Sequence, residues 1–208
     1  MLTSLGANVS AAYLIAAFTL ACPEMPSAPT DAVPKPALEL AYAPNGEMLP
    51  PTNYREWIYL SSGVDMSYTA KPADMTMFDN VFVNPDAYKS FVRTGTWPDK
   101  TMIVLETREA RNKGSISQHG HFQGTNLMGL EVHVKDTSRF PGQWAFFDFA
   151  SPTSNGTLFP PSASCYSCHR AHGAVDTTFV QFYPTLLPVA QSKGTLSPEF
   201  VKESGAAQ

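Results

Sequence analysis

Two cysteines and a histidine stand together near the end of the chain, in the run Cys165-Tyr166-Ser167-Cys168-His169. Thiols separated by two residues lie on one turn of chain, so both can add to the two vinyl groups along one edge of a haem. The adjacent histidine then offers an imidazole nitrogen to the iron beneath the ring. The spacing predicts one covalently bound haem c, attached through Cys165 and Cys168, with His169 as the axial ligand.

Two other uses of these cysteines are open to the same residues. A disulfide between them is possible in an exported protein, but it would leave His169 without a role. Zinc could bind both thiols and His172, yet the fourth ligand would have to come from a distant histidine such as His119 or His121. Neither alternative explains the whole motif, so haem c is the preferred interpretation.

The sequence singles out no sixth ligand for the iron. Methionine is the usual sixth ligand in electron-transfer cytochromes. The candidate methionines are Met66, Met75, Met77, Met102 and Met128. His119 and His121 lie in a polar stretch at 114–124, which we expect to be a solvated loop. We expect His133 on the polar, exposed face of its strand, and His172 facing solvent.

The elements that must position this motif are predicted to be mainly strands. The segments 101–106, 129–135 and 143–149 are rich in β-branched and aromatic residues, and the second alternates apolar and polar residues. One helix is expected between Asn84 and Gly95, which suit its two ends. The predicted fold class is mainly β (α+β): an antiparallel sheet with a few short helices, and the cysteine–histidine motif on a C-terminal helix.

The composition limits the classes of partner. The net charge is −4, and no run of lysine or arginine occurs in the 208 residues. A basic surface for nucleic acid is therefore not expected. Hydrophobic residues make up 43% of the chain, which is enough to build a core.

The first 22 residues are predicted to be a targeting segment. The stretch 11–21 is almost wholly apolar but too short to span a bilayer, as in a secretory signal peptide. Cys22 follows directly and resembles the lipidated cysteine of a bacterial lipoprotein, although Thr19 departs from that pattern. Both interpretations export the protein to the periplasm, with a lipid anchor at Cys22 in the second.

The rest of the chain divides by composition. Residues 23–51 are rich in Pro and Ala and are expected to form a linker. The folded haem domain is expected at 52–190, and a flexible tail at 191–208.

Six segments of this domain resemble, in the same order, the cytochrome P-460 family, which also contains the cytochromes c′-beta. They are NYREW at 53–57, VFVNPDAY at 81–88, TGTWPDKTMIVLE at 94–106, GLEVHVKDTSRFPGQWAFFDF at 129–149, CYSCH at 165–169 and FVQFYPTL at 179–186. The resemblance implies a mainly antiparallel β fold, a homodimer, and a high-spin haem whose distal side is open to small ligands.

The same resemblance separates two branches of the family. Hydroxylamine-oxidising members carry a lysine bonded to the haem ring, and Leu105 stands at that position here. Their distal arginine corresponds to Asp79, and the segment 157–161 lacks the carboxylate that they use for proton transfer. These departures favour a protein of the cytochrome c′-beta kind, without the lysine–haem bond.

The expected distal pocket is apolar, with Leu105 and Ile103 on one strand face and Phe78, Phe147 and Phe149 beside them. General acid–base chemistry needs a titratable group within reach, and none is expected there. Nitric oxide or carbon monoxide needs only an open iron site in a dry cavity. Gas binding is therefore the preferred function, and the alternatives are an enzyme oxidising hydroxylamine and a carrier that passes electrons to a redox partner protein.

Overall fold

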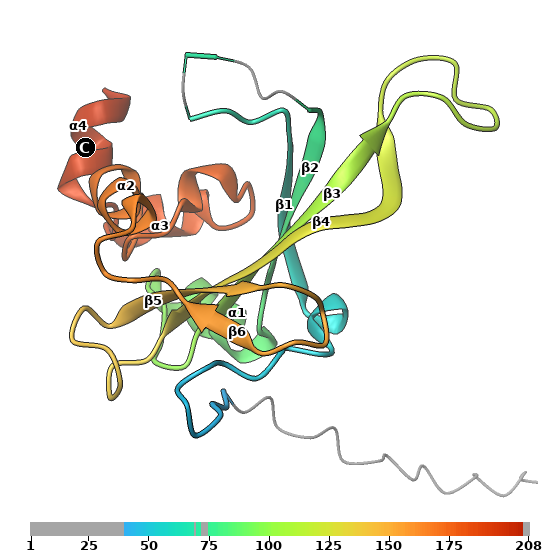
Figure 1. Ribbon diagram of the computed structural model, residues 1–208. Helices are drawn as coiled ribbons and strands as arrows, with labels where there is room; N and C mark the ends of the chain where they lie inside the picture. Colours follow the sequence, from blue (N-terminus) through green and yellow to red (C-terminus); the bar gives the residue numbers. More distant parts are fainter. Residues whose placement is uncertain (1–39, 69, 72–74, 206–208) are drawn as a thin grey trace, which may run out of the picture. The chain divides into compact units, whose positions relative to one another are not determined.

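The computed structural model describes residues 40–68, 70–71 and 75–205, and Figure 1 shows how their elements are arranged. Six strands form one sheet in which each strand pairs antiparallel with the next along the chain. The strands are β1 (Ile58–Val64), β2 (Met77–Val83), β3 (Met102–Arg111), β4 (Phe122–Lys135), β5 (Trp144–Phe149) and β6 (Gly156–Leu158). The α-helices are α1 (Pro85–Thr94), α2 (Ser164–His172), α3 (Leu187–Lys193) and α4 (Pro198–Ser204). This confirms the predicted class, mainly β with a few short helices, and places the cysteine–histidine motif on α2.

Helix α1 begins and ends where the local sequence favours it. Pro85 occupies the first turn, where a missing N–H costs nothing, and Gly95 ends the helix with a φ of 79°. Asn84 does not cap the helix with its side chain as its position suggested. Its Oδ1 instead accepts a hydrogen bond of 2.8 Å from the backbone N of Met102, which joins the start of α1 to β3.

Alternation along the strands separates two hydrophobic clusters, one on each face of the sheet. In β3, Ile103 belongs to the first cluster, which includes residues of α1 and α3. Met102 and Val104 belong to the second cluster, which Met48 and Trp57 cover from the N-terminal side. Both faces of the sheet are therefore covered. A polar residue that follows a buried residue in a strand points to the other face, and this face can also be buried.

The folded part begins before residue 52. Met48 pairs with Tyr42 and Gly156 in isolated bridges, and its side chain is 1% exposed in the second cluster. The linker expected at 23–51 is therefore too long, since its last residues complete the core. The expected signal peptide at 1–22 and Cys22 lie outside the described residues. Within the described ranges, no helix is long and apolar enough to cross a membrane.

Residues 191–205, which were expected to belong to a flexible tail, form part of the folded domain. The residues predicted as a flexible tail from 191 contain the end of α3 and all of α4. Ser197 caps α4 by accepting a hydrogen bond of 3.2 Å from Phe200 N, and Phe200 packs against the first cluster. The cap and the packing of Phe200 both help to hold this short helix on the domain.

Candidate functional site

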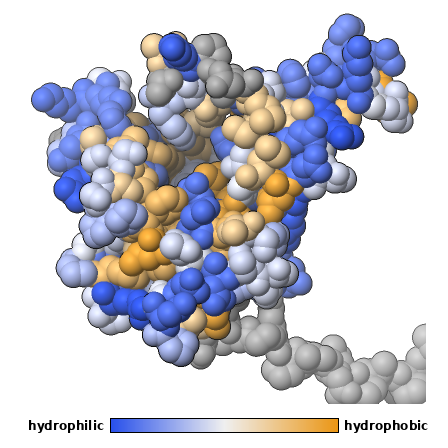
Figure 2. All heavy atoms as spheres, in the orientation of Figure 1, coloured by the Kyte–Doolittle hydropathy of each residue, from blue (hydrophilic) through white to orange (hydrophobic). Residues whose placement is uncertain are grey.

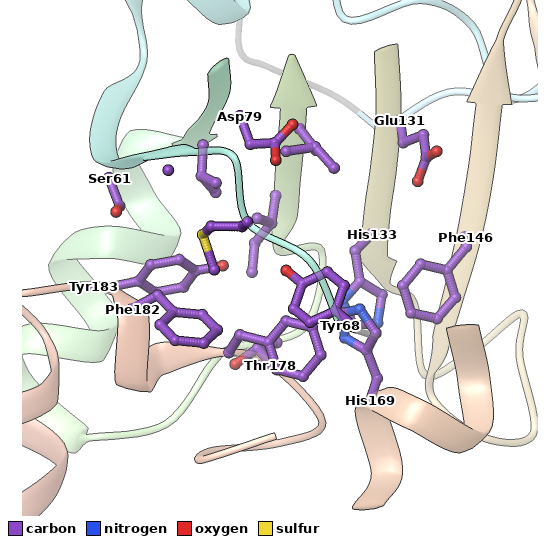
Figure 3. A pocket seen from close by; sticks show the side chains of 16 residues that line it. Ser61, Tyr68, Asp79, Glu131, His133, Phe146, His169, Thr178, Phe182 and Tyr183 are labelled. Carbon is purple, nitrogen blue, oxygen red and sulfur yellow. The ribbon is translucent and has the colours of Figure 1, made fainter. Parts of the chain in front are cut away.

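A cavity of about 330 Å³ lies between the sheet and the chain from α2 onward. The surface is hollowed between the helices and the sheet, and apolar residues gather around the hollow (Figure 2). Figure 3 shows Asp79 and Glu131 at one end of this cavity and His133 and His169 at the opposite end. We call these the acidic end and the histidine end.

The strand register explains this division. Ile103 pairs with His133, and His133 pairs with Phe146, so one row of side chains crosses the sheet at the histidine end. Two residues further along β3, Leu105 lies between Val81 and Glu131 in the next row. Along each of these strands, the residues that line the cavity are therefore two positions apart.

Helix α2 brings the motif to the cavity. Residues at positions i, i+3 and i+4 share one face of a helix, so Cys165, Cys168 and His169 point the same way. Both cysteines are half-buried and free, so the disulfide alternative is not formed. Burial raises the pKa of the Cys165 thiol. His169 lines the cavity, where its ring is available to a ligand.

The imidazole of His169 is held on several sides. Its Nδ1 lies 2.8 Å from the backbone O of Thr177, and its ring stacks on Phe179 at a centroid distance of 4.1 Å. The rings of Phe146 and His133 pack edge-on against it, at centroid distances of 4.7 and 4.9 Å. Burial lowers the pKa of His169, against the effect of the hydrogen bond to Thr177. With Nδ1–H donated to the carbonyl, Nε2 is the nitrogen left for a metal.

His133 was expected to be exposed, and that prediction is wrong. Its side chain is 7% exposed and lies flat on Phe146 at a centroid distance of 3.9 Å. Its Nε2 is buried and has no hydrogen-bond partner within the described part of the chain. Burial, with a smaller contribution from His169, holds its pKa well below the ordinary value. The alternation of residues along β4 is as predicted. The face that carries the polar residues, however, lines the cavity and does not face solvent.

The predicted distal residues are only partly brought together. Leu105 and Ile103 both line the cavity, as expected. Phe147 and Phe149 lie instead in the cluster on the opposite face of the sheet. Phe78 alternates with Asp79, which lines the cavity, so Phe78 is on the wrong face as well. The error has one cause, because each of these phenylalanines is one position out of register with the cavity residues of its strand.

Two carboxyl groups line the cavity, which corrects the expectation of an apolar pocket without a titratable group. Burial raises the pKa of Asp79, against the effect of a 3.0 Å hydrogen bond from Thr107 Oγ1. Burial also raises the pKa of Glu131, and the charges of Asp148 and Asp79 add to this. Glu131 is two positions from His133 and shares its strand face, but the spacing alone does not show that this face meets the cavity.

Of the five methionines considered as a sixth ligand, Met66 lines the cavity. Met102 is buried in the cluster on the other face, and Met75 and Met128 are largely exposed. Met77 has no place in the cavity lining. The structure therefore reduces the candidates to one.

The remaining histidines lie away from the cavity. His119 and His121 are exposed in the connection between β3 and β4, as expected. His172 is exposed and its Nδ1 lies 2.9 Å from a carboxylate oxygen of Glu203. No group of three or more potential metal-binding side chains occurs among the described residues, which gives the zinc alternative no support.

The residues present fit a haem. Two thiols and one imidazole lie on one face of α2 beside a cavity with an apolar side, which includes Ile103 and Leu105. His169 has its Nδ1 occupied by a carbonyl, as histidines that bind metals usually do. His169 would hold the iron, and the walls of the cavity would cover the ring.

Comparison with known proteins agrees with this geometry. No curated protein matches the chain. The family model described as Cytochrome P460 matches residues 51–180, which span the whole sheet, all of α2 and the carbonyl that faces His169. Since this match covers more than half of the 208 residues, the chain belongs to the cytochrome P460 family and is a haem-binding cytochrome.

Proposed function

We propose that this cytochrome carries one covalent haem c, attached through Cys165 and Cys168 and ligated by His169, and binds nitric oxide or a similar small gas at the open side. The observation that carries this proposal is Leu105, an apolar side chain in the cavity wall. Hydroxylamine-oxidising members of the family carry a nucleophilic lysine at that position, and a leucine cannot form a bond to the ring.

The bound haem would supply an iron site that a neutral diatomic molecule can occupy without a proton. The chain's own residues support this in two ways. His169 is held in one orientation, so it can serve as a fixed axial ligand. Leu105 and Ile103 make part of the cavity wall apolar, which favours a weakly polar diatomic ligand over water.

The acidic end supports a second candidate function, oxidation of hydroxylamine. Asp79 and Glu131 line the cavity, and each has a raised pKa. A carboxyl whose pKa approaches the working pH can accept a proton from a substrate and release it again. Leu105 weakens this candidate, because the hydroxylamine-oxidising members carry a haem-bonded lysine at that position.

Location and assembly belong to the same proposal. Attachment of haem c generally takes place outside the cytoplasm, which fits the predicted export signal at 1–22. We propose that the protein is periplasmic, with a lipid anchor if Cys22 is acylated. We also propose that it forms a homodimer, as in the family, and that a redox partner protein exchanges electrons with the haem iron.

The absorption spectrum of the purified protein tests the proposal. The reduced protein should be high-spin and five-coordinate, and nitric oxide or carbon monoxide should change the spectrum at stoichiometric concentration. A six-coordinate low-spin spectrum without added ligand would contradict it. Turnover of hydroxylamine with an electron acceptor would instead favour the second candidate.

Covalent attachment is tested separately on denaturing gels stained for haem. The double variant Cys165→Ser and Cys168→Ser should lose the stained band. Cys22→Ser is the matched control, since this third cysteine is outside the motif and its loss should leave the haem in place.

A further inference from the structure

A tight turn after α2 supplies the carbonyl that faces His169. Val175 and Thr178 pair across this turn, with Thr178 N donating to Val175 O at 2.8 Å. The two residues between them, Asp176 and Thr177, have φ values of 50° and 61°. Residues other than glycine rarely adopt this left-handed region, so two in succession persist only where the surroundings hold them.

Two side chains outside the turn hold it: Lys135 at the end of β4, and Trp97 in the connection between α1 and β3. Lys135 Nζ donates to Trp97 O at 2.8 Å and pairs with Asp176 Oδ2 at 3.0 Å. The indole Nε1 of Trp97 donates to Thr178 Oγ1 at 2.8 Å. Trp97 and Thr178 are 2% and 1% exposed, and the Lys135 side chain is 11% exposed. We call Lys135, Trp97, Asp176 and Thr178 the brace.

The turn also lies directly against the end of α2. A Cβ at Gly173 would come within 2.6 Å of the His169 O and 2.7 Å of the Thr177 C. Only glycine allows this approach, and the result is the 2.8 Å contact between Thr177 O and His169 Nδ1. The brace therefore fixes one side of this contact and α2 fixes the other.

We propose that the brace consists of positioning residues that set the donor strength of His169 toward the haem iron. This rests on the proposed role of His169 as axial ligand. A hydrogen bond from Nδ1–H to a carbonyl fixes the tautomer and the ring orientation, and it makes Nε2 a stronger donor. A stronger donor stabilises ferric over ferrous iron, so the brace lowers the reduction potential.

Two substitutions remove the brace in different ways. Asp176→Gly removes the carboxylate but suits the left-handed backbone, so its effect comes from the lost ion pair rather than from strain. Lys135→Met keeps the apolar stem and removes the charge. In both variants the reduction potential should rise and the iron–imidazole stretching frequency of the reduced protein should fall. Lys135→Arg, which restores the charge, should return both values toward the wild type.

The neighbouring ion pair between Lys100 Nζ and Asp136 Oδ1 provides the matched control, at 2.5 Å. This ion pair joins the residues just before β3 to those just after β4, and it does not touch the turn. Asp136→Ala and Lys100→Met should lower the unfolding midpoint while leaving the potential and the stretching frequency unchanged.

The outcomes separate this inference from the proposed function. If Asp176→Gly and Lys135→Met lower only the unfolding midpoint and keep the wild-type potential and stretching frequency, the brace is structural and the inference is wrong. If His169→Ala retains the wild-type iron–imidazole band, the axial assignment itself is wrong. If Lys135→Met fails to fold, Asp176→Gly decides the question, since the side chain of Asp176 is 33% exposed and easier to replace.

Discussion

The two ends of the cavity differ in how firmly their side chains are held. At the histidine end, His169 is fixed by a carbonyl and three aromatic neighbours, and His133 is almost fully buried between rings. At the acidic end, Asp79 and Glu131 are only half-buried, and their pKa values are raised by burial. The histidine end therefore holds its rings in one arrangement, whereas the carboxyl groups of the acidic end can gain or lose a proton.

This difference suits a site with a permanent ligand on one side and an exchangeable ligand on the other. A fixed imidazole needs neighbours that pack at interior density. A ligand that enters and leaves needs a wall that tolerates water and changes of protonation. Changes at the histidine end should therefore alter stability and ligation together, whereas changes at the acidic end should alter ligand chemistry with little cost to the fold.

The largest effect is expected at His133. His133→Ala removes a buried ring that stacks on Phe146 and contacts His169. We expect a loss of about 2–4 kcal/mol in the free energy of unfolding, as for other large-to-small core substitutions. Denaturant unfolding measures this, with the exposed His121→Ala as control. A loss no larger than that of the control would show that the histidine end is not rigidly packed.

The next effect is expected from Leu105→Lys. A lysine here would stand in the cavity beside Glu131 and would restore the nucleophile of the hydroxylamine-oxidising branch. Its bond to the ring should displace the Soret band far to the red after oxidative maturation. Leu105→Ile, which is apolar, of the same size and without an atom that can ligate iron, should keep the wild-type spectrum. A lysine variant without any cross-link would mean that Leu105 does not face the ring as the register suggests.

A smaller effect concerns the pH dependence of stability. A carboxyl whose pKa is raised on folding binds more protons in the folded state, so stability falls as the pH rises above its ordinary value. For Glu131 that value is 4.5, and burial raises it in the folded protein. Glu131→Gln should therefore unfold at a higher denaturant concentration than wild type at pH 7, but not at pH 3.

Asp86→Asn is the control for this measurement, because the Asp86 side chain is 95% exposed on α1. It should leave the pH dependence unchanged. An equal gain for both variants at pH 7 would indicate a general effect of net charge and would remove the distinction between the two ends.

The smallest effect is expected at Met66, the methionine that lines the cavity. If the iron is open on this side, Met66→Leu should leave the spectrum of the reduced protein as it is. Loss of a six-coordinate band in this variant would identify Met66 as the sixth ligand and would favour the electron-carrier alternative.

Local chemistry explains most of what could be predicted. The strands at 101–106, 129–135 and 143–149 and the helix ending at Gly95 all appear, because alternation, β-branched residues and end signals act over a few neighbours. The domain limits were less accurate. Met48 and Phe200 each pack against a core that the sequence around them does not reveal.

The sequence by itself determined the cysteine–histidine motif, the family and the absence of a lysine at Leu105, since each depends only on residue type and spacing. The tertiary structure alone decided which face of each strand meets the cavity. It placed His133, Asp79 and Glu131 there and put Phe78, Phe147 and Phe149 elsewhere. The physical reason is that both faces of the sheet are covered. A period of two separates the faces but carries no information about which covering leaves a cavity.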